Sequence, residues 1–367
     1  MFMSGVSAPG SNDVWAVGGT LTNSDQSFPV LEHWDGRAWK TVKMPASFKG
    51  FPFDPYQIAA SSAADVWVFT PAGEPKTGPA AGRWAHWNGR SWTTGALPSV
   101  LVAGNNSPSV TITAAAAAGP GDVWVGVTVS DWNTKSGLPA ATFLANDDRG
   151  TWRTYRLPAS LVDVAGISAL SRADVWAVAT GDPGTSGVAS GVSNDSVLMR
   201  FNGRSWQSIP EPKGAYADAV AGVSAHSAWV TGLVPGKGPD HVTYVAGAAY
   251  WNGARWTIVP DVAADEGFGQ ETDYVDALTS VTPDGRGGLW TVAEGYAPIV
   301  GSLPGPASLW HYANGRWTGV QLGSLGDLSL FQLARAPGSG SVWAVGTAVA
   351  AATPGYPEDG SILRYQN

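Results

Sequence analysis

The sequence contains no cysteine and few charged residues, and both shortages narrow what the protein can do. Without cysteine there are no disulfides, no thiolate metal ligands and no cysteine nucleophile. Charged residues make up only 14% of the 367 residues, and 21 Lys and Arg against 29 Asp and Glu give a net charge of -8. No cluster of basic residues interrupts this balance, so the electrostatic field that binds a nucleic-acid backbone is missing. No apolar run reaches the length of a membrane-spanning helix.

The beginning of the chain also lacks the features of an export signal. Residues Met1-Phe2-Met3-Ser4-Gly5 include neither a basic segment nor an apolar one. The first expected strand nevertheless starts within a few residues of Met1. We therefore expect that this chain belongs to a secreted or cell-envelope protein and that the export signal lies outside it. Flanking domains of a longer polypeptide are one explanation for the missing signal.

A tryptophan followed by apolar alternation recurs seven times, at intervals of 52 to 61 residues. The seven residues are Trp15, Trp67, Trp124, Trp176, Trp229, Trp290 and Trp343. About twenty residues after most of them, an aromatic residue precedes Asp-Gly or Asn-Gly and another tryptophan, as in Trp34-Asp35-Gly36-Arg37-Ala38-Trp39. Both residues of such a dipeptide accept the positive φ of a tight turn, so it predicts a hairpin. In the third copy this element is degraded to Asp148-Arg149-Gly150-Thr151-Trp152.

Each copy therefore predicts a four-stranded meander, with a small-residue strand a, a Trp strand b, an aromatic strand c and an outer strand d. Seven such sheets, arranged radially, bury both faces of every sheet against neighbours. The prediction is an all-β, seven-bladed β-propeller of four-stranded antiparallel blades, forming one domain over 1–367. The expected blades are about 1–45, 46–98, 99–158, 159–210, 211–261, 262–322 and 323–367. The last copy ends where its outer hairpin would begin, so we expect that blade to lack its outer strand.

The first copy resembles the kelch repeat through Val14-Trp15-Ala16-Val17-Gly18-Gly19 and the later Glu32-His33-Trp34-Asp35. The hairpin element is also similar to the Asp-box of sialidases and related glycoside hydrolases. Trp-rich bacterial propeller lectins use a similar blade. The resemblance covers nearly the whole chain and implies a propeller fold, and the last two families point to carbohydrate.

Strand order places the long b–c and d–a loops on one face, and function is expected on that face. Sixteen of the 19 tryptophans occupy repeat positions and are expected to pack between blades. Trp132 lies outside the repeat, where it either stacks on a sugar or folds back onto the disc. The ligand-binding candidates on this face are Asp131, Trp132, Asn133, Phe53, Tyr56, Tyr216, His241, Tyr244, Tyr274 and Tyr296.

Carboxylates gather in the loop 262–276 and near Phe53. If the protein is an enzyme, the catalytic candidates are Asp265, Glu266, Glu271, Asp273 and Asp54, acting as a glycoside hydrolase or lyase. The same oxygen ligands would suit Ca²⁺, although their spacing matches no EF-hand loop, and a solvated acidic loop is the simpler interpretation. No zinc motif, phosphate-binding loop or nucleophile elbow is present, so no cofactor is predicted.

Three functions remain open at this point. The leading hypothesis is a non-catalytic module that recognises carbohydrate or another surface ligand through the long-loop face. The alternatives are a glycoside hydrolase or lyase, and a protein-interaction domain of a larger exported protein.

Overall fold

The computed structural model describes residues 2–21, 27–46, 48, 57–70, 82–102, 108–131, 141–181, 196–211, 215–235, 244–259, 277–295, 305–320, 327–349 and 358–366. Within these ranges the chain forms strands and one short 3-10 turn, Ser99–Val102. No helix long and apolar enough to cross a membrane occurs among them.

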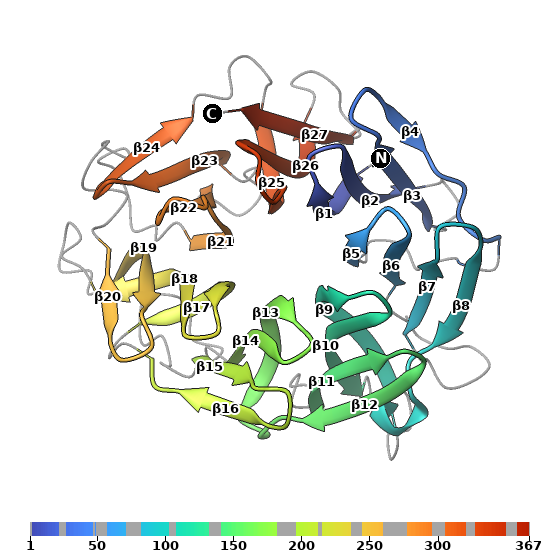
Figure 1. The fold of residues 1–367 in the computed structure, drawn as a ribbon, viewed down its shortest axis with the longest axis horizontal. Helices are drawn as coiled ribbons and strands as arrows, with labels where there is room; N and C mark the ends of the chain where they lie inside the picture. Colours follow the sequence, from blue (N-terminus) through green and yellow to red (C-terminus); the bar gives the residue numbers. More distant parts are fainter. Residues whose placement is uncertain are drawn as a thin grey trace.

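In the described residues the strands form seven antiparallel sheets arranged radially around an open centre (Figure 1). Blade 1 consists of β1 (Phe2–Gly10), β2 (Asp13–Leu21), β3 (Ser27–Trp34) and β4 (Trp39–Thr41). Blade 2 consists of β5 (Gln57–Ser62), β6 (Asp65–Thr70), β7 (Arg83–Trp87) and β8 (Trp92–Ala96). Blade 3 consists of β9 (Pro108–Gly119), β10 (Asp122–Asp131), β11 (Ala141–Asp148) and β12 (Thr151–Arg156). Blade 4 consists of β13 (Leu161–Ser171), β14 (Asp174–Gly181), β15 (Ser196–Phe201) and β16 (Trp206–Ile209).

The remaining blades continue the same order. Blade 5 consists of β17 (Tyr216–Ser224), β18 (Ser227–Pro235), β19 (Tyr244–Trp251) and β20 (Trp256–Ile258). Blade 6 consists of β21 (Ala277–Pro283), β22 (Leu289–Gly295), β23 (Gly305–Ala313) and β24 (Arg316–Val320). Blade 7 has three strands, β25 (Asp327–Arg335), β26 (Ser341–Val349) and β27 (Glu358–Gln366). The seven-bladed fold and the three-stranded last blade are confirmed.

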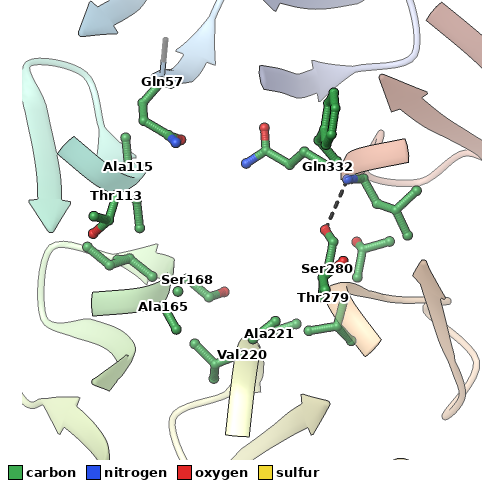
Figure 2. A pocket seen from close by; sticks show the side chains of 18 of the residues that line it. Gln57, Thr113, Ala115, Ala165, Ser168, Val220, Ala221, Thr279, Ser280 and Gln332 are labelled. Atoms are coloured by element: carbon green, nitrogen blue, oxygen red, sulfur yellow. Dashed lines mark hydrogen bonds between the residues drawn. The ribbon is translucent and has the colours of Figure 1, made fainter. Parts of the chain in front are cut away.

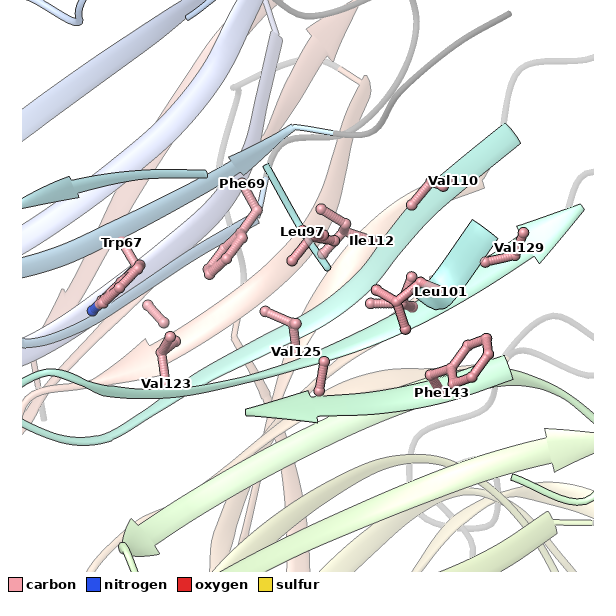
Figure 3. Close-up of a cluster of buried hydrophobic side chains, with 13 residues drawn as sticks. Trp67, Phe69, Leu97, Leu101, Val110, Ile112, Val123, Val125, Val129 and Phe143 are labelled. Carbon is pink, nitrogen blue, oxygen red and sulfur yellow. The ribbon is translucent and has the colours of Figure 1, made fainter. Parts of the chain in front are cut away.

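The core consists of side chains pressed between neighbouring blades. Figure 3 shows the cluster between blades 2 and 3, where Trp67 and Phe69 of β6 face Val123 and Val125 of β10. Alternation along each strand sends one set of side chains to each neighbouring blade. The strand-b tryptophans are almost completely buried in this way, and Trp176 is fully inaccessible. Stability therefore comes from seven inter-blade cores of similar construction.

The turns on the short-turn face fall into two groups. The a–b turns of blades 1 to 5 contain two residues between the strands, whereas those of blades 6 and 7 contain five, residues 284–288 and 336–340. These two longer turns are neighbours in the ring. They set blades 6 and 7 apart from the rest of this face.

The c–d turns differ from the prediction in their backbone. In blades 1, 2, 4 and 5 only the glycine has a positive φ, between 87° and 92°. The preceding Asp or Asn instead accepts two backbone N–H groups, as Asp35 does from Arg37 and Ala38 at 2.9 Å each. Among the described residues, positive φ at a non-glycine residue is confined to Arg149 and Asn314, the turns of blades 3 and 6, each with φ of 53°.

Candidate functional site

The centre of the ring is a channel of about 630 Å³ (Figure 2). Strand a of every blade contributes to its wall, from Phe2 and Ser4 of blade 1 to Gln332 of blade 7. The wall consists of small, apolar and neutral polar residues, and none of the residues that line it is charged. A paired acid and base for hydrolysis is therefore absent from this wall.

Several hydroxyl groups in or near this wall connect neighbouring blades. Ser7 accepts the Ala60 backbone N–H, Ser168 that of Gly222 and Ser280 that of Leu333, each at 3.0 Å. Thr113 donates to the Val164 carbonyl at 2.8 Å, and Gln332 accepts the Val6 N–H at 2.7 Å. These contacts span five of the seven blade junctions. Part of the polar lining of the channel is thus used to join blades.

A second recurring arrangement lies near the short-turn face. The carboxylate that begins strand b meets a polar strand-c side chain, which lies against the strand-b tryptophan. In blade 2, His86 Nε2 is 2.8 Å from Asp65 Oδ1, and the imidazole stacks on Trp67 with ring centroids 3.9 Å apart. Blade 1 repeats this with His33, and blade 6 with His311 and Asp284 of its a–b turn. Blade 4 substitutes Arg200, which pairs with Asp174 at 2.8 Å.

Each of these histidines joins strand c to the carboxylate before or at the start of strand b within its own blade. Among the described residues, no three His, Asp or Glu side chains gather closely enough to hold a metal ion. Burial pushes the pKa of Asp65 upward, but hydrogen bonds from His86, Ser61 and the Gly121 amide of blade 3 outweigh it, so the pKa lies below its usual value. Asp65 is therefore ionised and joins two blades.

One junction leaves space beside this arrangement. Between blades 2 and 3 lies a pocket of about 410 Å³. Its lining is rich in aromatic and polar side chains: Trp67, Trp84, His86, Thr93, Gly95, Ala96, Gly121, Asp147, Arg149, Gly150 and Trp152. Three indoles therefore line one pocket beside a carboxylate and a guanidinium, with Trp67 and Asp147 almost completely buried.

The pocket exists because of two local departures from the repeat. Trp84 pairs across the sheet with Gly95, where a Cβ atom would lie 2.3 Å from the indole, so the glycine lets the ring lie over strand β8. The indole nitrogen of Trp84 donates to the Ala96 carbonyl at 3.1 Å, which fixes the ring. On the opposite wall, Arg149 holds an unfavourable positive φ and its backbone N–H donates to the Gly121 carbonyl at 2.7 Å.

The two charged side chains Asp147 and Arg149 differ in whether they have a hydrogen-bond partner. Asp147 is 1% exposed and accepts the Gly150 N–H, and burial, reinforced by the neighbouring Asp148, raises its pKa. The Arg149 guanidinium is exposed and has no hydrogen-bond or ion-pair partner among the described residues. A strained backbone that presents an unpaired polar group is typical of a binding site.

Buried acids form a further cluster between blades 4 and 5. Tyr216, a predicted ligand-binding residue, begins β17 and is half-buried. Burial raises the pKa of its hydroxyl, and the carboxylates of Asp218, Asp163 and Glu211 add to the effect. Tyr216 and Glu211 line a small cavity that opens little to solvent. A ligand-binding role for Tyr216 stays a prediction.

Glu211 makes the stability of this cluster depend on pH. Burial raises its pKa to about 7, although Ser196 donates a hydrogen bond to it. Between the unfolded pKa near 4.5 and the folded value, the folded state binds more protons, so the free energy of unfolding falls as pH rises through this window. We expect wild type to lose about 3 kcal/mol relative to Glu211→Gln between pH 4.5 and 8, measured by urea unfolding. Parallel pH profiles of the two proteins would contradict this.

Most of the residues predicted to bind or react lie outside the described residues. These are Asp54, Asp265, Glu266, Glu271 and Asp273 among the catalytic candidates, and Phe53, Tyr56, Trp132, Asn133, His241, Tyr274 and Tyr296 among the binding candidates. Asp131 ends β10 and Tyr244 begins β19, but their side chains are not described. Their roles stay predictions.

Comparisons with known proteins agree on the fold. The GH74 xyloglucanase of Xanthomonas campestris aligns with a TM-score of 0.55 and 13% identity, over 98% of this chain and 54% of the enzyme. This chain thus spans about half the length of that protein. A PL25 ulvan lyase aligns at 0.54 and 10% over 97% and 89% of the two chains. The β-propeller domain of Cps50 (Swd1) from Myceliophteria thermophila aligns at 0.52 and 10% over 100% and 97%.

These likenesses show a propeller fold and no more, because all the identities are far below 25%. The fucose-binding lectin of Aleuria aurantia also aligns, with a TM-score of 0.47 and 12% identity over 86% of this chain and 94% of the lectin, which is too weak to carry an argument. No protein-family model matches the sequence, and no curated protein matches it. The kelch and Asp-box resemblances are therefore not confirmed.

The pocket between blades 2 and 3 was missed by reasoning from the sequence. Trp84 was given no functional role, and Arg149 was noted only as part of a degraded turn. The usable signal was that degradation: three residues before the strand-d tryptophan, the third copy has an arginine where the other copies of this turn have Gly or Asn. In a repeat protein, a copy that breaks the shared pattern is a candidate for function.

Proposed function

We propose that this propeller is a non-catalytic carbohydrate-binding module and that a sugar binds in the pocket between blades 2 and 3. The observation that carries the proposal is the convergence of Trp67, Trp84 and Trp152 with Asp147 and Arg149. Indole faces accept the apolar C–H face of a pyranose ring, while a carboxylate and a guanidinium bind its hydroxyl groups. A volume of about 410 Å³ has room for one or two sugar rings.

The structural neighbours make carbohydrate a reasonable class for this scaffold. By their names, one is a xyloglucanase and one a polysaccharide lyase, so two of them act on polysaccharides. The name of the third, the Swd1 β-propeller domain, mentions no carbohydrate. The proposal therefore depends on the pocket. The long-loop face around Trp132 and Tyr274 remains a separate proposed contact surface.

The preference for binding over catalysis comes from the chemistry of the pocket. Asp147 is buried and hydrogen-bonded to the Gly150 amide, and the only other ionisable groups in the lining are His86 and Arg149. His86 is already held by Asp65 and stacked on Trp67. Two free carboxyl groups flanking a glycosidic bond are not available in this lining. Glycoside hydrolysis by loop carboxylates remains the alternative.

A glycan array followed by calorimetric titration of its strongest hits tests the proposal. Trp84→Ala removes an indole and is expected to weaken binding at least tenfold, the loss typical of one buried stacking contact and its desolvation. Arg149→Asn removes the guanidinium but suits the turn, because blade 6 has an asparagine, Asn314, with the same φ of 53° at the equivalent position. This variant is expected to keep or raise the melting temperature while also losing about tenfold in affinity.

The matched control is Trp310→Ala. Trp310 is a strand-c tryptophan that also packs over a strand-d glycine, Gly319, but in blade 6. It is expected to lower stability without changing glycan affinity. If no glycan binds, carbohydrate recognition is wrong, and if binding survives both Trp84→Ala and Arg149→Asn, the pocket is wrong. Consumption of the bound glycan would show that the protein is an enzyme.

A further inference from the structure

A second pocket lies across the ring, between blades 6 and 7. It has a volume of about 240 Å³ and lies between the two five-residue a–b turns. Its lining contains two guanidinium groups, Arg286 and Arg335, together with Asp284, His311 and Trp290, and is otherwise glycine and Ser339. Cationic side chains therefore outnumber the carboxylate, although the protein as a whole carries a net charge of -8.

Arg335 occupies a position that the other six blades fill with a small or apolar residue. In blade 7, Ala334 of strand a pairs with the strand-b tryptophan, Trp343, and Arg335 is the next residue of strand a. The equivalent residues are Ala8, Ala60, Ala117, Ala169, Gly222 and Pro283. The fold thus has no need of an arginine here. Its presence in blade 7 calls for a different reason.

The Arg335 guanidinium reaches across the blade junction and lies unpaired. Its nitrogens lie against Gly285 of blade 6, 2.7 Å and 2.8 Å from where a Cβ atom would stand, so a side chain there would displace the guanidinium from this position. Two arginines are half-buried among the described residues, Arg200 and Arg335. Arg200 pairs with Asp174 at 2.8 Å, whereas Arg335 has no carboxylate within ion-pair distance in the described part of the chain.

The one carboxylate in the pocket is already occupied. Asp284 Oδ1 accepts the backbone N–H groups of Arg286 and Gly288, and its Oδ2 is 3.2 Å from His311 Nε2. Burial pushes its pKa up, but the two amides and His311 outweigh this and hold the pKa below its usual value. Asp284 therefore shapes the turn that presents Arg286, rather than neutralising either guanidinium.

We propose that the pocket between blades 6 and 7 is an oxyanion-binding site, in which Arg335 and Arg286 bind a sulfate, phosphate or carboxylate group. A half-buried guanidinium without a counter-ion has lost part of its hydration, and its planar fork of donors matches an oxyanion with two parallel hydrogen bonds. The ligand is a small anion or the charged group of a larger molecule. The site is independent of sugar binding between blades 2 and 3.

Calorimetric titration of the intact protein tests the site, with sodium sulfate, sodium phosphate and sodium glucuronate at constant ionic strength and glucose as the neutral probe. At least one of the three anions is expected to bind, and Arg335→Ala is expected to weaken that binding at least tenfold. The variant should fold, because blades 2, 3 and 4 already have alanine at this position of strand a, in the same register with strand b. Binding of sulfate or phosphate alone indicates a tetrahedral group, and binding of glucuronate an acidic sugar.

Two controls separate the site from other effects. Arg204→Ala removes an exposed arginine of the blade 4 turn and should leave anion binding unchanged. Trp84→Ala should also leave it unchanged, so a failure of the sugar pocket and a failure of this site give different results. The proposal is overturned if no anion binds, or if wild type and Arg335→Ala bind each anion equally, which would indicate a general salt effect.

Discussion

Replacing Trp124 with alanine should lower the free energy of unfolding by about 4 kcal/mol. Trp124 is 1% exposed and extends from β10 into the junction with blade 4. Its ring centroid lies 4.9 Å from that of Phe201 and 5.2 Å from that of Trp206, the second in an edge-on contact. Removing the indole leaves a cavity that three rings and two rigid sheets cannot close, so most of the packing energy is lost.

Chemical denaturation with a fluorescence-independent readout such as circular dichroism measures this loss. The indole nitrogen of Trp124 has no hydrogen-bond partner among the described residues, so the substitution breaks no hydrogen bond. Trp124→Phe should cost clearly less, because a ring still fills most of the space. Val100→Ala, at a side chain that is 57% exposed, should change stability by less than about 0.5 kcal/mol. A loss of under about 1 kcal/mol for Trp124→Ala would show that the stability of the blades does not depend on the strand-b tryptophans packed between them.

Alanine at Gly18 or Gly232 should cost more than about 3 kcal/mol, although it adds a single methyl group. Both glycines stand three residues after a strand-b tryptophan, opposite a bulge in strand a. A Cβ atom at Gly18 would lie 1.9 Å from the Phe2 carbonyl oxygen, and one at Gly232 would lie 2.1 Å from that of Tyr216. Gly232 also holds a φ of 151°, which an L side chain rarely adopts.

Gly10→Ala is the matched control for these variants. Its nearest neighbour would be the Asp13 Cβ at 3.7 Å, an ordinary contact, so the change should be neutral or slightly stabilising. Thermal or urea unfolding compares all three. Equal stability of Gly10→Ala and Gly18→Ala would mean that strands a and b can move apart without a loss of folding free energy. The close approach at the bulge would then not affect stability.

The sequence was sufficient for the architecture because its signals repeat. Trp15, Trp67 and their counterparts mark strand b seven times, and the hairpin dipeptides mark the c–d turns, so an error in one copy is corrected by the others. The Asp65–His86 pair was not predicted. Its two residues are 21 apart in the chain and meet only in one strand register, which the sequence pattern leaves undetermined.

The pockets could be predicted even less. Gly95 is an ordinary glycine in the sequence, and its importance comes from the indole of Trp84 lying across it. Arg335 looks like one more surface charge until the register aligns it with the small residues of the other blades. Both sites form between blades, so they depend on tertiary geometry that no single repeat encodes. The long-loop candidates such as Asp265 and Trp132 stay predictions.

The junction of blades 7 and 1 has a kinetic consequence. Six junctions join consecutive blades, but this one joins segments from opposite ends of the chain. Trp34 and Trp39 pack around Trp343, and the Arg364 guanidinium lies over the rings of Trp34 and Trp343. Gln332 also accepts a hydrogen bond from the Val6 N–H. In the described ranges no strand is shared across this junction. Bringing ends about 350 rather than about 50 residues apart together costs roughly 2 kcal/mol more in chain entropy. We therefore expect closure of the ring to be a late step of folding, and this aromatic seam to be where the ring opens first.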